Sequence, residues 1–96
     1  MIHYVLLKFK PGTWTEEIRA LADTTFRQLE QEVPSIISAK IYENCYERES
    51  NADVMIRLKI DSPEHLTEYL HHPLHVRFAE ITTPLRSQPV VSFDRM

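Results

Sequence analysis

The segment DVMIRLKI, at positions 53–60, alternates between aliphatic side chains and longer or charged ones. That period of two is typical of a β-strand with one face in a hydrophobic core. The opening segment IHYVLLKFK, at positions 2–10, also predicts a strand, which Pro11 and Gly12 end. One of its faces carries His3, Val5, Leu7 and Phe9, and the other is also largely apolar. We therefore expect both faces of this strand to contact protein rather than water.

A helix is expected after the first strand. Thr13-Trp14-Thr15-Glu16 matches a capping box with Thr13 as the cap. Apolar residues then recur every three or four positions from Ile18 to Val33, and Pro34 ends the helix. A second strand is predicted from Ile37 to Tyr46, and a polar hairpin loop at positions 47–51 joins it to the third.

The second half of the chain repeats a helix and a strand. Ser62 is expected to cap a helix with Pro63 in its first turn, running to about His71. A further helical stretch is predicted from Pro73 to about Leu85, and a last strand covers positions 90–93. The order β-α-β-β-α-β predicts a single α+β domain of ferredoxin-like fold over residues 1–96. In that fold, helices cover one face of a four-stranded antiparallel sheet.

The opposite face of the predicted sheet carries Tyr4, Leu6, Tyr42 and Met55. An apolar patch of this kind usually marks an interface. Two copies that pair through these faces across a two-fold axis would bury it. The sequence therefore predicts a homodimer.

Composition excludes several classes of function. Apolar residues make up 43% and charged residues 26%, which is ordinary for a globular domain. A net charge of −3 argues against nucleic-acid binding, and no apolar run is long enough to span a membrane. The N-terminus does not resemble a signal peptide, so we expect a cytoplasmic protein. The single cysteine, Cys45, excludes an intrachain disulfide and is interpreted as a packed strand residue.

Three of the five histidines lie together in His71-His72-Pro73-Leu74-His75. A metal site is disfavoured, because Pro73 interrupts the helix between them and no acidic or thiol ligand is adjacent. In a structural interpretation, the His72 ring accepts a hydrogen bond from a backbone amide at the helix start, and His75 is satisfied by hydrogen bonds. In a catalytic interpretation, His75 transfers a proton near neutral pH and Tyr69 polarises a carbonyl.

His3 lies among apolar residues on the face that meets the helices. A polar ring there needs a hydrogen-bonding partner, or else it lines a cavity. Both interpretations of His3 stay open, as does the interpretation of Tyr69 and Phe26 as plain core residues.

The chain resembles the stress-responsive A/B barrel (Dabb) family. The resemblance rests on HYVLLKFKPG at positions 3–12 and YLHHPLHV at positions 69–76, with the His-Pro-x-His core at 72–75 as its most specific part. It extends over nearly the whole chain, and implies a ferredoxin-like subunit that pairs through its sheet into a dimeric α+β barrel. It also implies a pocket between sheet and helices in each subunit.

The resemblance suggests an activity without fixing it. A characterised family member, plant olivetolic acid cyclase, performs a cofactor-free aldol cyclisation with a tyrosine and a histidine, which fall on Tyr69 and His75 here. Its strand-one pocket histidine falls on His3. We expect no cofactor and no metal, with the following side chains lining a pocket for an apolar or aromatic ligand: His3, Val5, Leu7, Phe26, Val54, Ile56 and Leu66.

Two other functions remain open. The first is a non-catalytic dimer with a stress-response or ligand-binding role. The second is an activity like that of the cofactor-free monooxygenases and haem-degrading enzymes of the wider superfamily. No motif in this chain specifically indicates such an activity.

Overall fold

The computed structural model describes residues 1–96 and has the predicted order of elements. In chain order the elements are β1 (Ile2–Leu7), α1 (Glu16–Glu32), β2 (Ile36–Glu43), β3 (Val54–Ile60), the 3-10 helix η1 (Pro63–His65), α2 (Leu66–Leu70), α3 (Pro73–Thr82), the 3-10 helix η2 (Thr83–Leu85) and β4 (Val91–Arg95). The second helical region is divided before Pro73, since a proline ring cannot occupy a helix interior without loss of a hydrogen bond. The α+β ferredoxin-like prediction is confirmed.

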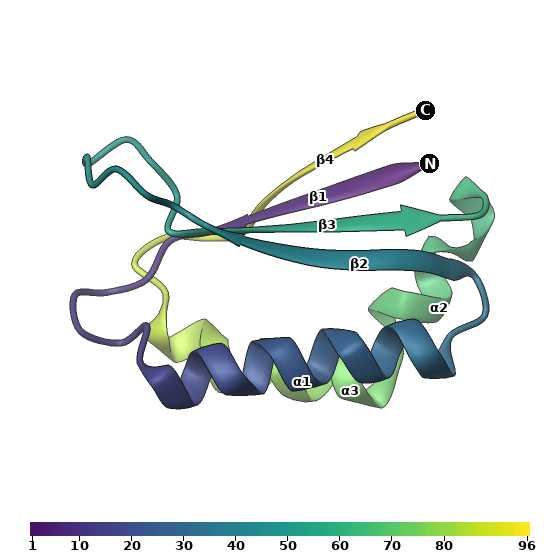
Figure 1. Cartoon of the computed structure of the whole chain (residues 1–96), viewed down its shortest axis with the longest axis horizontal. Helices are drawn as coiled ribbons and strands as arrows, with labels where there is room; N and C mark the ends of the chain where they lie inside the picture. The colour runs from purple at the N-terminus through teal and green to yellow at the C-terminus, as the bar shows by residue number, and fades with distance from the viewer.

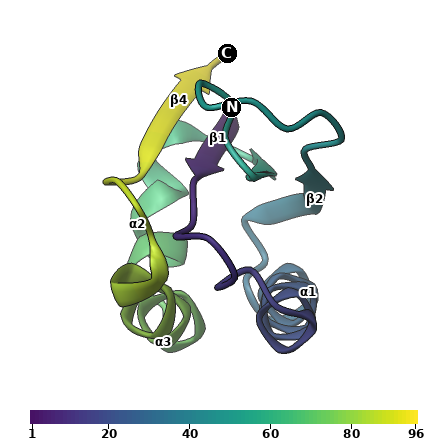
Figure 2. The ribbon, with the colours of Figure 1, turned by 90° about the vertical axis from the view of Figure 1, so that its left-hand side faces the viewer.

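The four strands form one antiparallel sheet in the order β2-β3-β1-β4. The helices α1 and α3 lie on one side of this sheet, as Figure 1 shows. Viewed from the end, α1 and α3 run side by side beneath it (Figure 2). The hydrophobic core lies between these two layers. Among its members, Leu7, Leu29, Ile56 and Leu58 are at most 1% exposed. None of the helices is long and apolar enough to cross a lipid bilayer.

The start of α1 differs from the prediction. Thr15, not Thr13, is the cap, and its hydroxyl accepts a hydrogen bond from the Ile18 amide at 3.3 Å. The Thr13 hydroxyl instead donates to the carbonyls of Lys10 and Leu85. The predicted capping box is therefore wrong. Both threonines satisfy the residue preference for a cap, and the turn after β1 commits Thr13 elsewhere.

The course of β2 also differs from the prediction. The strand begins one residue earlier and ends at Glu43, and its register shifts between Ile36 and Ser38. Because of this bulge Ile36 is buried, while Ile37, predicted on the apolar face, is 53% exposed. Cys45 lies beyond the strand and is exposed, so its interpretation as a packed strand residue is wrong.

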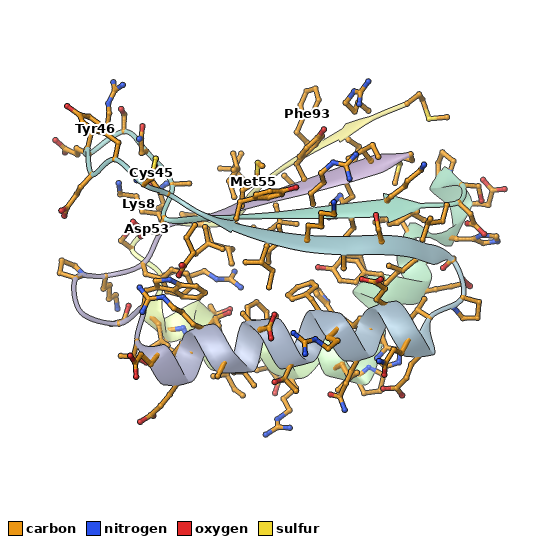
Figure 3. All side chains as sticks on the ribbon, in the orientation of Figure 1. Lys8, Cys45, Tyr46, Asp53, Met55 and Phe93 are labelled. Atoms are coloured by element: carbon orange, nitrogen blue, oxygen red, sulfur yellow. The ribbon has the colours of Figure 1, made fainter.

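The sheet face away from the helices is apolar at its centre. Tyr4 pairs with Phe93 on β4, and Leu6 pairs with Met55 on β3. Figure 3 shows Phe93 and Met55 on the side opposite α1 and α3. Phe93 is 62% exposed. Val91, opposite Leu6, extends the predicted patch along β4.

Candidate active site

A cavity of about 280 Å³ lies between the inner face of the sheet and helices α2 and α3. Its lining is mostly apolar, with a few polar and titratable side chains. The lining residues are His3, Val5, Leu7, Phe26, Ile56, Leu66, Tyr69, Leu70, His75, Phe78, Ala79, Arg86, Val90, Ser92 and Asp94. An apolar enclosure with a few convergent polar groups is typical of a small-molecule site.

The cavity brings together most of the side chains named from the sequence. His3, Tyr69 and His75 all border it, as do the expected apolar residues with one exception. Val54 is that exception. It is 1% exposed and packs within the continuous core, opposite Leu7 at the hairpin end of β3. The expectation that Val54 lines the pocket is therefore wrong, because sharing a face of the sheet with lining residues does not place a side chain beside the empty space.

The break before Pro73 positions His75. The His72 ring accepts a hydrogen bond from the Leu74 amide at 3.1 Å and caps α3, which confirms the structural interpretation of His72. His75 lies within the first turn of the new helix, and its Nδ1 lies 2.9 Å from the Leu70 carbonyl at the end of α2. A carbonyl oxygen can only accept, so Nδ1 carries the proton and Nε2 keeps its lone pair. The helix break therefore leaves Nε2 of the neutral His75 ring with a free lone pair.

Burial reinforces this state. Desolvation lowers the pKa of His75 below its ordinary value of 6.5, and the nearby charges of His3 and Arg86 act in the same direction. The hydrogen bond to Leu70 opposes this shift without outweighing it. The imidazole is thus neutral at neutral pH, which is the form that can accept a proton.

Tyr69 forms the wall next to His75. The centres of the two rings are 4.4 Å apart, and the His3 ring lies 5.9 Å from the tyrosine ring. Tyr69 is 2% exposed, and burial raises the pKa of its hydroxyl, while the charge of Arg86 partly offsets that effect. The phenol therefore stays protonated and can donate a hydrogen bond. Tyr69 also packs on Phe26 in the core, so the core interpretation and the site interpretation hold together.

His3 has a partner that was not predicted from the sequence. Its Nδ1 forms a hydrogen bond with the Asp94 carboxylate, directly opposite on β4. The last strand was predicted to end at position 93, which left Asp94 outside it, whereas β4 runs to Arg95. Pairing the first strand with the last and extending the latter by two residues would have found the contact.

Arg86 is a second charged lining residue, after Asp94, that was not predicted. It follows η2, lies opposite Phe9 in an isolated bridge, and directs its Nη2 to the Thr82 hydroxyl at 2.8 Å. Arginine in a chain segment between helix and strand carries no periodic signal. Nothing in the sequence pattern therefore marked it.

The histidine cluster does not converge on one point. His72 and His75 each use Nδ1 for a backbone partner, and nowhere are three histidine, cysteine or acidic side chains grouped as a metal site requires.

A larger hollow of about 610 Å³ lies by the β2–β3 hairpin and is lined mainly by polar and charged residues. Several of these groups bind one another: Trp14 donates to Glu43, and the Lys8 ammonium holds the hairpin carbonyl of Asn51. Figure 3 shows Lys8 near Asp53 at this end. We therefore place the candidate site in the cavity between the sheet and helices α2 and α3.

Comparison with known proteins agrees with the fold. The sequence matches the family described as the stress responsive A/B barrel domain (Dabb) over residues 1–96. The chain belongs to the Dabb family. Among curated proteins no match was found.

Solved structures share the fold of this Dabb chain at low identity. A dimeric ferredoxin-like protein of unknown function from Bacteroides fragilis has a TM-score of 0.73 and 17% identity, with 98% of this chain and 94% of that chain covered. The Arabidopsis thaliana protein At3g17210 has a TM-score of 0.75 and 21% identity, with 99% and 94% covered. A hydroxynitrile lyase from Passiflora edulis has a TM-score of 0.73 and 13% identity, with 96% and 89% covered.

Proposed function

We propose that this Dabb protein is a homodimeric, cofactor-independent acid–base enzyme. Its substrate is a small carbonyl compound of aromatic or polyketide-like character, bound in the cavity between the sheet and helices α2 and α3. The observation that carries the proposal is the pairing of a neutral, oriented His75 with a protonated Tyr69 in one apolar enclosure. Two titratable groups with pKa values pushed in opposite directions are the usual signature of an acid–base pair.

In the proposed reaction, His75 Nε2 removes a proton from the carbon next to the substrate carbonyl. The electron pair of the broken C–H bond forms an enolate, whose negative charge develops on the carbonyl oxygen. Tyr69 donates a hydrogen bond to that oxygen, and the low polarity of the cavity strengthens the interaction. The His75 imidazolium then returns its proton to the enolate, on carbon or on oxygen, so that no proton is gained or lost overall. His3, held by Asp94, orients the bound molecule.

Relatives support this class of chemistry by analogy. The Passiflora edulis protein of the same fold is named a hydroxynitrile lyase. Since a fold hosts many chemistries, this likeness adds less than the site itself. The residues of the cyclase pattern, Tyr69, His75 and His3, all border the cavity.

The dimer is proposed through the sheet face that the helices leave open. Tyr4, Leu6, Met55, Val91 and Phe93 form an apolar patch there, in pairs across the strands. The Bacteroides fragilis neighbour is described as dimeric. Closing two such faces on one another removes the patch from water and leaves the cavity of each subunit on the far side of its sheet.

Proton abstraction can be tested without knowledge of the natural substrate. 4-Hydroxyphenylacetone, a ketone with acidic protons beside its carbonyl, is incubated with the protein in D₂O, and loss of these protons is followed by ¹H NMR. We expect acceleration by the wild type. His75→Gln should lower it by about 100-fold or more, the usual contribution of a positioned base, with a melting temperature close to that of the wild type.

The matched control is His71→Gln, which alters an exposed histidine of the same segment and should leave the exchange rate as it is. Absence of acceleration in the wild type, with the ketone bound in the cavity by NMR, contradicts the enzyme and supports a ligand-binding dimer. If the His75→Gln variant does not fold, His75 has a structural role. The Tyr69→Phe variant then tests whether the Tyr69 hydroxyl contributes to the exchange rate.

A further inference from the structure

Arg86 is a cation inside the cavity without a carboxylate partner. None of the four ion pairs of the chain includes it. Asp94, the acidic residue of the cavity lining, is committed to His3. The Arg86 side chain is partly buried, and its Nε–H is fully shielded from solvent without any hydrogen-bond acceptor. A buried, unsatisfied donor on a charged group is costly, so such groups are normally paired.

The guanidinium is fixed rather than mobile. Its Nη2 donates to the Thr82 hydroxyl, which in turn donates to the Phe78 carbonyl in the last turns of α3. The main chain of Arg86 is tied to Phe9 by the isolated bridge. Both ends of the side chain are therefore anchored, and its remaining donors are pre-organised. A pre-organised planar fork of N–H groups matches the two oxygens of a carboxylate.

Arg86 acts on the same space as the candidate acid and base. Its charge influences the pKa of both Tyr69 and His75, and burial lowers the pKa of Arg86 itself without removing its charge at neutral pH. The cavity thus holds a fixed cation without a carboxylate partner beside a mostly apolar lining. Its volume of about 280 Å³ suits one substituted ring, because an apolar cavity of roughly 150 Å³ already admits benzene.

We infer that Arg86 is a specificity-determining residue that binds the negatively charged group of a small aromatic or acyl substrate, in the first instance a carboxylate. This inference rests on the proposed function, because it concerns the ligand of the same cavity. An anion on the Arg86 guanidinium would supply the missing countercharge and leave the apolar body of the molecule against Phe26 and Phe78. The carbonyl chemistry would then take place between the anchored group and the pair Tyr69 and His75.

The test compares two ligands of nearly the same shape, one with a carboxylate and one with a neutral amide. 4-Hydroxybenzoate and 4-hydroxybenzamide are titrated into the full-length protein at pH 7.5, and dissociation constants are taken from NMR shifts. We expect the benzoate to bind about tenfold or more tightly than the amide, since hydrogen bonds to charged groups exceed neutral ones by that margin. The ¹⁵Nε resonance of Arg86 should move with the benzoate only.

Variants locate the source of the preference. Arg86→Gln should bind the two ligands within about threefold of each other, mainly through weaker benzoate binding, while Arg86→Lys should keep part of the preference. Arg77→Gln, on the exposed side of α3, is the matched control and should behave as the wild type.

Each result separates this inference from the proposed function. Equal binding of both ligands by the wild type, or an unchanged preference in Arg86→Gln, overturns the role of Arg86 and leaves the cavity as a ligand site. Failure of both ligands to bind overturns the cavity as a site for single-ring ligands, and the role of Arg86 with it. If Arg86→Gln does not fold, the wild-type comparison and the Arg86 resonance still decide.

Discussion

The hydrogen bond from His75 Nδ1 to the Leu70 carbonyl does two things at once. It ties the start of α3 to the end of α2, and it selects the imidazole tautomer with a free Nε2 lone pair. The residue type at position 75 was readable from the sequence, and so was the break at Pro73. The carbonyl that fixes the tautomer was not, because any backbone carbonyl can serve and only the packed structure shows which one does.

The lowered pKa of His75 predicts the pH dependence of the proposed reaction. The base form persists on acidification until the pH falls through the folded-state pKa, which burial holds below 6.5. The rate of deuterium exchange should therefore fall on acidification, and the midpoint of this fall should lie below pH 6.5. An acid limb centred above pH 6.5 would show that a different group serves as the base.

The same shift affects stability with a definite sign. Between the folded-state pKa and 6.5 the unfolded chain binds a proton at His75 that the folded chain does not. The free energy of unfolding should therefore rise with pH across this window. Urea unfolding at pH 5 and pH 7 should show a smaller pH dependence for His75→Gln than for the wild type. An equal pH dependence in both proteins would contradict the burial of a neutral ring.

At the scale of elements, the strand and helix types followed from periodicity, whereas two local features did not. An alternating pattern cannot reveal the bulge between Ile36 and Ser38. The residue types on either side of a bulge are the same as those in a regular strand. Nor does residue preference choose between two threonines two positions apart. In both cases the competing backbone partners become visible only in the folded chain.

The cap of α1 can be tested directly. Thr15→Ala removes the acceptor for the Ile18 amide and should lower the free energy of unfolding by about 1 kcal/mol. Thr24→Ala, at an exposed position within the same helix, is the matched control and should be neutral or slightly stabilising, because alanine has the higher helix propensity. Chemical denaturation measures both. A larger loss for Thr24→Ala than for Thr15→Ala would refute the assigned cap.

At the scale of the whole molecule, the order and sidedness of the sheet explain why the cavity-lining residues and the outer apolar patch could both largely be predicted. Alternation divides each strand between an inner face, which forms the cavity, and an outer face, which forms the patch. What alternation could not supply is the lateral position of a side chain. Val54 shares the inner face yet lies outside the cavity, while Arg86, from the segment before β4, enters it.

The proposed dimer makes a prediction at this scale. Phe93→Glu introduces a charge into the outer apolar patch and should convert the protein to folded monomers in sedimentation velocity at micromolar concentration. Val76→Glu alters another exposed apolar residue, 40% exposed on α3, and should leave the dimer intact. A Phe93→Glu protein that sediments as the wild-type dimer would place the interface elsewhere.

The site itself is tested most directly through the histidine rings. Side-chain ¹H–¹⁵N correlation spectra of the wild type, recorded with and without 4-hydroxyphenylacetone, report the tautomer and the surroundings of every imidazole. We predict that His75 carries its proton on Nδ1 at pH 7.5 and that the His3 and His75 signals move on titration, while those of His65 and His71 stay in place. A protonated or Nε2–H His75, or a titration that leaves both cavity rings unmoved, would contradict the account.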